Sequence, residues 1–157
     1  YEGFLTILEF PTGKCTLSNI YSALDKYPDT QLLIVDYLQL LQPPKKRKEL
    51  RFDLSDLAIG LRGIAAEANI HCASAAQASR LSRNKRIVGA QYAAEDYGIF
   101  RVADIGIGMG QNEDDRSKKE VVFYIDKSRD SEKNSCERYF VDFKHMRFNY
   151  LREESVK

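Results

Sequence analysis

The stretch LLIVDYLQLL, residues 32–41, decides the fold prediction. It opens with four apolar residues and places Asp36 directly after them. A short all-apolar run predicts a strand that is buried on both faces, as the strands of parallel sheets usually are. Ligands of open α/β sheets bind beyond the carboxyl ends of the strands, so a carboxylate here can hold Mg²⁺, directly or through water, beside nucleotide phosphates. A strand-end turn residue or a helix cap is the alternative interpretation of Asp36.

The residues before this stretch predict a strand, a turn and a helix. FLTILEF, residues 4–10, is rich in apolar and β-branched residues, and PTGKCT, residues 11–16, supplies the turn. The turn resembles a phosphate-binding loop, but the pattern G-x-x-x-x-G-K-[ST] fails at Leu8 and at Cys15. Thr16 can cap the helix that follows. The turn therefore does not by itself predict a nucleotide site.

Helix and strand patterns alternate after residue 41. Asp53 can cap a second helix, because the apolar residues that follow it recur at helical spacing. Strands are predicted at residues 71–76, 102–109, 121–127 and 138–143. We expect the last two strands to form a hairpin and residues 110–119 to form a charged turn. The pattern predicts one α/β domain over residues 1–157, with a mostly parallel sheet flanked by helices and a C-terminal antiparallel hairpin.

Composition bounds the class of protein. The 157 residues carry 24 basic and 23 acidic side chains, so attraction to nucleic acid must come from local clusters of charge. The three cysteines form no C-x-x-C pair and there are only two histidines, which argues against a structural zinc site or a disulfide framework. No apolar run approaches the roughly 20 residues that span a bilayer. We expect a cytoplasmic protein that does not bind membranes.

Polar and basic residues follow the strand at residues 71–76. Gln77 stands where an amide can hydrogen-bond a terminal phosphate or an attacking water, although it can equally satisfy the backbone of its loop. The segment RLSRNKR, residues 80–86, has no apolar periodicity and can follow a phosphate backbone. A solvated surface loop is the alternative. Its basic residues are Arg80, Arg83, Lys85 and Arg86.

A second pair of cations lies at the end of the strand at residues 121–127. Lys127 and Arg129 are separated by one residue, so both can reach the same anionic group. An exposed hairpin tip is the alternative interpretation. The basic run at residues 43–51 is expected to be a solvated connection or a partner contact.

Four blocks in this order resemble the second part of the RecA-like motor domain of DnaB-type replicative helicases, in a form similar to phage-encoded members. The resemblance covers about residues 4–148, and FPTGKCT also resembles a phrase of the phage versions. The blocks are LLIVDYLQLL, RFDLSDLAIGLRGIAAEANI leading into ASAAQASR, EDYGIFRVADIGIGM, and VVFYIDKSRD.

The resemblance implies a P-loop NTPase fold and roles for individual residues. It implies that Asp36 is the Walker B acid for Mg²⁺, that Gln77 senses the γ-phosphate of ATP, and that Lys127 and Arg129 reach the ATP of a neighbouring subunit. The basic residues of 80–86 would face single-stranded DNA in the channel of a hexameric ring. A primase or a helicase loader is a further implied partner, and the location would be the host cytoplasm if the protein is phage-encoded.

The chain also departs from the family pattern. The family usually has K-N-R followed soon by glycine, whereas Ser128 and Ser131 stand here, and Ala76 replaces a common serine. The P-loop and the catalytic glutamate of the family lie upstream of the segment that resembles LTILEFPTG. We therefore expect a fragment, or one piece of a split protein, that does not hydrolyse ATP alone. The alternatives are another RecA-superfamily ATPase, of the recombinase or clock type, and a non-enzymatic module that binds DNA or a partner.

Overall fold

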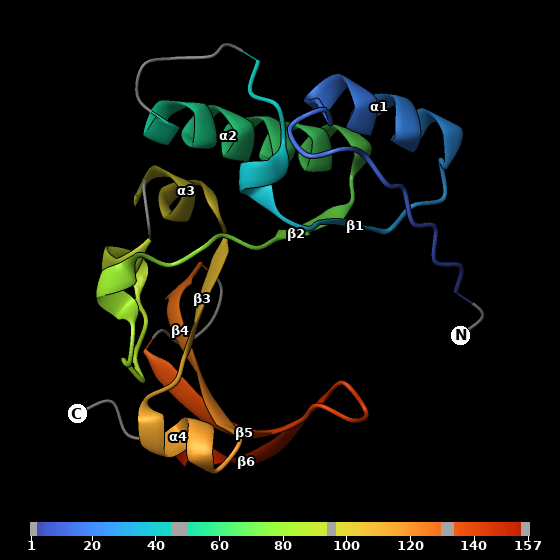
Figure 1. Cartoon of the computed structure of the whole chain (residues 1–157). Coiled ribbons are helices and arrows are strands. Elements are labelled where there is room, and N and C mark those ends of the chain that lie inside the picture. The colour runs from blue at the N-terminus through green and yellow to red at the C-terminus, as the bar shows by residue number, and fades with distance from the viewer. Residues whose placement is uncertain (1–2, 45–49, 94–96, 130–133, 155–157) are drawn as a thin grey trace. The chain divides into compact units, whose positions relative to one another are not determined.

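The computed structural model describes residues 3–44, 50–93, 97–129 and 134–154. The chain divides into two compact units, Tyr1–Ala75 and Ala76–Lys157, and each is described by itself (Figure 1).

The first unit begins with the predicted turn and helix. Gly13 adopts a positive φ of 69°, a conformation that glycine reaches without steric cost, and its amide donates to the Leu40 carbonyl at 3.0 Å. Thr16 caps α1 (Leu17–Lys26), and a reciprocal pair of hydrogen bonds with Asn19 completes a capping box. The prediction of a Thr16 cap is confirmed.

The strands of the first unit are β1 (Leu32–Val35) and β2 (His71–Ser74), which pair in parallel. A short 3₁₀ turn, η1 (Leu38–Leu40), follows β1, and α2 (Leu50–Ala68) precedes β2. Helices α1 and α2 lie on one side of the strand pair (Figure 1). The core of the unit is apolar and consists mainly of Ile20, Val35, Leu38, Leu54, Leu57, Leu61 and Ile64.

Three predictions for the first unit are wrong. Residues 4–10 are irregular rather than a strand, and Phe4 is fully exposed, because a strand needs a neighbouring strand to pair with and these residues have none among those described. The strand β1 is buried on one face only, since Ile34 is 64% exposed while Val35 is buried. Asp53 does not cap α2. The helix starts at Leu50, and Asp53 is a buried residue of its first turn.

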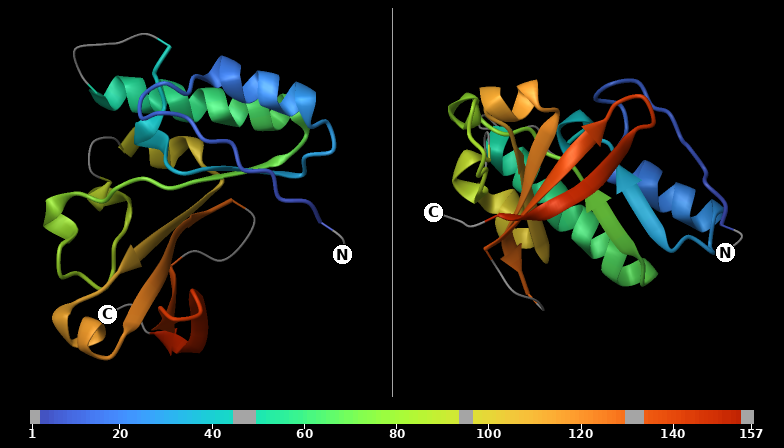
Figure 2. Two further views of the ribbon diagram at one scale, coloured as in Figure 1. Left: turned by 45° about the vertical axis from the view of Figure 1, so that its right-hand side comes forward. Right: turned by 90° about the horizontal axis from the view of Figure 1, so that it is seen from below.

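The second unit is built on a four-stranded antiparallel sheet with the order β3-β4-β5-β6 (Figure 2). Its strands are β3 (Ile105–Gly110), β4 (Glu120–Ser128), β5 (Ser135–Asp142) and β6 (Arg147–Glu154). Its helical segments are η2 (Arg80–Ser82), η3 (Ala90–Tyr92), α3 (Tyr97–Val102) and α4 (Glu113–Ser117). Val122, Tyr124 and Cys136 form its apolar core, and Ile87 packs against them.

The predicted hairpin is confirmed as β4 and β5, and the sheet extends further than the sequence indicated. Strand β6 was not predicted, because its residues are largely exposed and alternate less clearly. The segment expected as a charged turn contains α4, which Asn112 caps through a reciprocal pair of hydrogen bonds with Asp115. Together the parallel pair, its helices and the antiparallel strands confirm the α/β class.

Within the described residues, no helix combines the length and the apolar character needed to cross a membrane.

Candidate functional site

Asp36 directly follows β1, at the carboxyl end of the parallel pair, and it is exposed. Two hydrogen bonds tie the ends of the two strands together. The Ser74 hydroxyl donates to the Val35 carbonyl at 2.9 Å, and the Leu38 amide donates to the Ala75 carbonyl at 3.2 Å. The predicted position of Asp36 at a strand end is therefore confirmed, while its role in binding a metal stays a prediction.

The surroundings of Asp36 bear on which kind of metal site it could complete. No group of three or more His, Cys, Asp or Glu side chains suited to a metal occurs within the described part of the chain. Mg²⁺ is usually held by one or two carboxylates together with substrate phosphates and waters, rather than by a cage made only of protein ligands. One exposed carboxylate at a strand end fits that mode of binding.

Gln77 lies three residues beyond the end of β2 and is exposed. The chain around it is held by the second unit. Ala78 forms an isolated antiparallel bridge with Ala93, and the Ser79 amide donates to the Tyr92 carbonyl at 2.7 Å. Asp36 and Gln77 thus belong to different units, and each has the position after its strand that the sequence predicted.

The basic loop, residues 80–86, is fixed by close contact of its last residues with β3. A Cβ atom added at Gly108 would lie 1.5 Å from the Val88 carbonyl oxygen, and one added at Gly110 would lie 2.2 Å from the Arg86 carbonyl oxygen. Only glycine permits this approach. Alternate residues of a strand share a face, so the glycines of the sequence IGIGMG form one surface on which the chain from Lys85 to Val88 lies.

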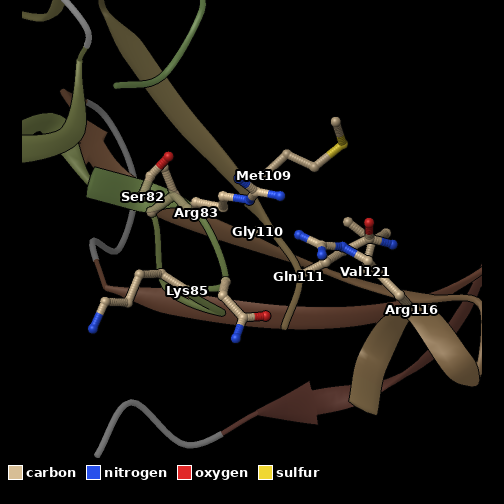
Figure 3. Close-up of a pocket in the computed structure, with 10 residues that line it drawn as sticks. Ser82, Arg83, Lys85, Met109, Gly110, Gln111, Arg116 and Val121 are labelled. Atoms are coloured by element: carbon tan, nitrogen blue, oxygen red, sulfur yellow. The ribbon is translucent and has the colours of Figure 1, made fainter. Parts of the chain in front are cut away.

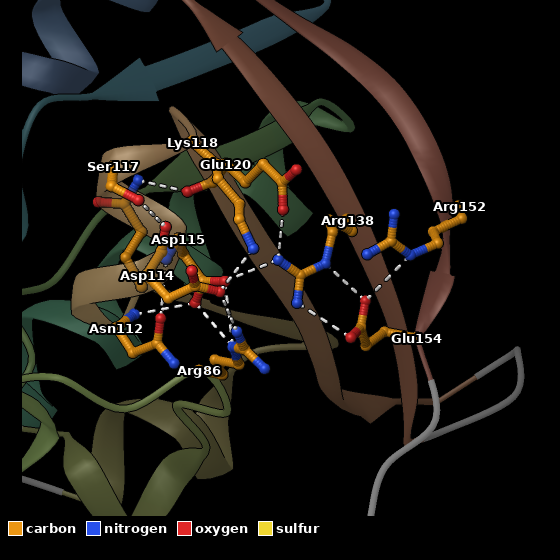
Figure 4. Close-up of polar contacts among 11 residues, drawn as sticks. Arg86, Asn112, Asp114, Asp115, Ser117, Lys118, Glu120, Arg138, Arg152 and Glu154 are labelled. Atoms are coloured by element: carbon orange, nitrogen blue, oxygen red, sulfur yellow. Dashed lines mark hydrogen bonds and ion pairs between the residues drawn. The ribbon is translucent and has the colours of Figure 1, made fainter.

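Arg86 differs from the other basic residues of the loop. Arg80, Arg83 and Lys85 are exposed, whereas the Arg86 guanidinium binds the Asp115 carboxylate through Nε at 3.1 and 2.9 Å and also contacts Asp114 (Figure 4). Burial alone raises the pKa of Asp115, but the hydrogen bonds from Arg86, Asn112 and Arg138 outweigh it and lower this pKa from 3.8 to about 2.

Arg138 of β5 completes this ionic cluster. Its side chain is 2% exposed and contacts Asp115 at 2.7 Å, Glu120 at 2.6 Å and Glu154 at 2.6 Å. Hydrogen bonds from Glu154, Asp115 and Glu120 raise the pKa of Arg138 despite its burial. Because Asp115 is fully buried as well, the cluster joins α4, the basic loop and the sheet into one body.

Lys127 and Arg129 both bind partners within their own chain. The Lys127 ammonium donates to the Phe100 carbonyl at 2.9 Å and to the Arg101 carbonyl at 2.7 Å, at the last turn of α3. Arg129 forms a salt bridge with Asp104 at 2.9 Å, and both side chains are about half exposed. Exposed ion pairs of this kind contribute about 0–1 kcal/mol, so a phosphate group can replace the Asp104 carboxylate at low cost.

Comparison with solved structures identifies the fold. The chain is similar to a solved ATPase domain of a DnaB-like helicase, and to a structure of a DnaB-like replicative helicase described with its interactions with primase. Each has a TM-score of 0.76 and 22% sequence identity and covers 88% of this chain. The chain has a RecA-like helicase ATPase fold.

The match covers only part of each known structure. The chain spans about half of the matched ATPase domain, 52% of its length, and 35% of the DnaB-like replicative helicase chain. The sequence matches no protein-family model and no curated protein. The likeness therefore concerns the fold, and the RecA-like prediction is confirmed at that level.

Four residues of this RecA-like chain shape the candidate site but were not predicted from the sequence. Asp115 and Arg138 hold the basic loop, Asp104 holds Arg129, and Arg116 of α4 lines a pocket together with Arg83. The alternating glycines of β3 were a readable signal, because such a series indicates close approach of another backbone. The ion pairs gave no signal, since their partners are 23–29 residues apart in the sequence or were assigned to a charged turn.

Proposed function

We propose that this chain is part of an ATP-dependent replicative DNA helicase of the DnaB type, a ring-forming motor that moves on single-stranded DNA. The observation that carries the proposal is the likeness of 88% of the chain to two helicase structures, combined with an exposed Asp36 at the carboxyl end of β1. In α/β sheets this is the edge at which ligands bind.

Asp36 and Gln77 are proposed to act on the nucleotide bound by their own subunit. Asp36 would hold Mg²⁺, directly or through water, and the bound ion would neutralise charge on the phosphates of ATP. Gln77 would hydrogen-bond the γ-phosphate or the attacking water, and its position just before the basic loop would pass loss of that phosphate to the loop. The 157 residues contain no G-x-x-x-x-G-K-[ST] motif, so this proposal concerns the protein together with a P-loop.

Arg129 and Lys127 are proposed to act on the ATP of a neighbouring subunit. Arg129 is the better placed of the two, because its guanidinium is 49% exposed and its carboxylate partner, Asp104, is exposed as well. Lys127 must first leave the carbonyls of α3. An arginine that acts in trans can contribute about 10³ to 10⁵ in rate. Such a contact requires a closed head-to-tail ring, for which a hexamer is proposed.

The basic loop is proposed to contact single-stranded DNA. Arg80, Arg83 and Lys85 are exposed and can bind phosphates, whereas Arg86 has its charge committed to Asp115. We assign Arg86 the role of anchoring the loop to α4. A primase or a helicase loader is a proposed partner, and one of the two matched helicase structures is described with its interactions with primase.

The experiment that tests this proposal is ATP hydrolysis with and without single-stranded DNA. It compares three proteins, which are this chain, a version extended upstream to include the P-loop, and the extended version with Arg129→Ala. We expect activity only in the extended version, stimulation by DNA, and a loss of at least about 10³-fold with Arg129→Ala while ATP still binds.

Arg147→Ala is the matched control. Arg147 is an exposed arginine of β6 in the same unit and has no proposed role, so its replacement should leave hydrolysis unchanged. An extended protein that folds and binds ATP but does not hydrolyse it would contradict the proposed motor. Equal effects of the two substitutions would contradict the role of Arg129.

A further inference from the structure

A pocket of about 220 Å³ lies in the second unit between the basic loop and the segment that joins β3 to β4 (Figure 3). Among the described residues, its lining contains no aspartate or glutamate. The polar side chains around it are Ser82, Arg83, Asn84, Lys85, Gln111 and Arg116. A pocket lined by three cations and three neutral polar groups is chemically suited to an anion.

Both walls of the pocket are held in place. The loop wall is short because the Arg83 amide donates to the Arg80 carbonyl at 3.1 Å and the Lys85 amide donates to the Ser82 carbonyl at 3.0 Å. Its close approach to Gly110 fixes its distance from β3. The opposite wall is α4, and the salt bridge between Arg86 and Asp115 connects the two walls at 2.9 Å. The pocket therefore exists before any ligand binds, and binding does not require the walls to be ordered.

The charges around the pocket are unequally compensated. Arg86 and Lys118 both bind acidic side chains of α4, with Lys118 to Asp114 at 2.8 Å. Neither Arg83 nor Arg116 forms a salt bridge within the described ranges of the chain, and both are exposed. Figure 3 shows the Arg83 side chain extending toward Gln111 and Arg116, whereas Lys85 extends away from them. Two guanidinium groups that face one space repel each other until an anion binds between them.

We infer that this pocket binds a phosphate group, held between Arg83 and Arg116. The planar fork of arginine suits phosphate oxygens, and two such forks from separate elements can bind one phosphate from two sides. The inference rests on the proposed function in one respect only, because it assigns the phosphate to the backbone of single-stranded DNA. Exposed Arg80 continues the same basic loop and can contact a neighbouring phosphate.

Arg116 gives the clearest test, because it comes from α4 and not from the basic loop. The 157-residue chain is titrated against a fluorescein-labelled oligothymidylate at several salt concentrations, in its unmodified form and with Arg116→Ala, Arg83→Ala or Arg147→Ala. Fluorescence anisotropy gives the dissociation constants, and circular dichroism checks that each variant is folded. ATP and inorganic pyrophosphate serve as unlabelled competitors.

We expect Arg116→Ala and Arg83→Ala each to weaken binding of oligothymidylate about three- to tenfold at low salt, the order expected for the loss of one charge-assisted contact. Each should also lower the slope of log affinity against log salt by about 0.7, the value for one phosphate of a single strand. Arg147→Ala should change neither quantity.

Two other results are informative. If the arginine variants weaken competition by ATP and pyrophosphate but not binding of the oligonucleotide, the phosphate site is supported and its ligand is a free nucleotide. If Arg116→Ala behaves as Arg147→Ala does with every ligand, or if the unmodified chain binds none of them, the inference is overturned. Because the titration requires no ATP hydrolysis, it can fail while the proposed motor stands, and the reverse is also true.

Discussion

Asp115 is the residue whose charge contributes most clearly to the second unit. It is fully buried between Arg86 and Arg138, and its pKa is lowered from 3.8 to about 2. A carboxyl group whose pKa is lower in the folded state stabilises the fold above the unfolded pKa and loses this effect as the pH falls through the folded value. We therefore expect the free energy of unfolding to fall by roughly 1–2 kcal/mol between pH 4 and pH 2, after allowance for solvent screening.

The measurement is urea unfolding at a series of pH values, with Asp115→Asn and the control Glu113→Gln. Glu113 is an exposed carboxylate of the same short helix, so its replacement removes the same charge without touching the cluster. Asp115→Asn should be less stable at neutral pH and should lose less stability between pH 4 and pH 2 than the unmodified chain. A pH profile in this variant that matches the unmodified chain would show that other carboxylates cause the acid sensitivity.

Gly108 is the residue on which the position of the basic loop depends. A Cβ atom there would lie 1.5 Å from a backbone oxygen of Val88, so Gly108→Ala must displace the loop or β3 and should destabilise the chain by about 1–3 kcal/mol. Gly63→Ala is the matched control. A Cβ atom at Gly63 of α2 meets no other atom within 4 Å, so this change should stabilise the helix by roughly 0.5–1 kcal/mol. Urea unfolding midpoints of the two variants should thus move in opposite directions.

At this scale the sequence located residues better than it located their partners. Asp36 and Gln77 could be placed at strand ends because a change from apolar to polar residues marks where a strand ends. The contacts of Arg86 and Arg129 could not be predicted, since their acidic partners come from other segments of the fold. Net charge and local sequence do not specify such pairs.

Among the elements, β1 shows how a correct strand prediction can give the wrong environment. The apolar run LLIV predicted burial on both faces, yet Ile34 is 64% exposed and only Val35 is buried. We expect Val35→Ala to destabilise the chain by about 1–3 kcal/mol, and Ile34→Ala by less than about 1 kcal/mol. Thermal unfolding of the two variants checks this difference, and equal losses would mean that Ile34 is also buried in solution.

The remaining errors in the elements have separate physical causes. The apolar pattern of residues 4–10 is typical of a strand, but a strand forms only beside a partner, and periodicity does not show whether one is present. The start of α2 and the presence of α4 were missed for a different reason. Acidic and amide side chains favour several positions near a helix start, so Asp53 could be placed as a cap although it lies inside the first turn.

For the whole molecule, the α/β class followed from the order of helices and strands, whereas the extent of the antiparallel sheet did not. A pattern of short strands does not distinguish a hairpin from a four-stranded sheet, because pairing is decided by contacts that are distant in the sequence. The RecA-like fold was predicted from the order of sequence blocks and is confirmed by structural similarity over 88% of the chain.

The proposed ring predicts that two inactive variants can complement each other. If Arg129 acts on the ATP of the next subunit, a ring mixed from Asp36→Asn and Arg129→Ala subunits contains some interfaces in which both residues are intact. With random mixing this is about one interface in four, so the mixture should recover up to about a quarter of the ATP hydrolysis. Each variant alone is the control, and a mixture as inactive as its components would contradict action in trans.

The measurement that tests the central claim most directly is separation of a forked DNA duplex by the chain extended upstream, with ATP and with a non-hydrolysable ATP analogue. We predict that ATP supports strand separation, that the analogue does not, and that Asp36→Asn abolishes it. ATP hydrolysis without strand separation would instead indicate another RecA-type ATPase. DNA binding without either activity, in a folded protein, would indicate a binding module and contradict the proposed helicase.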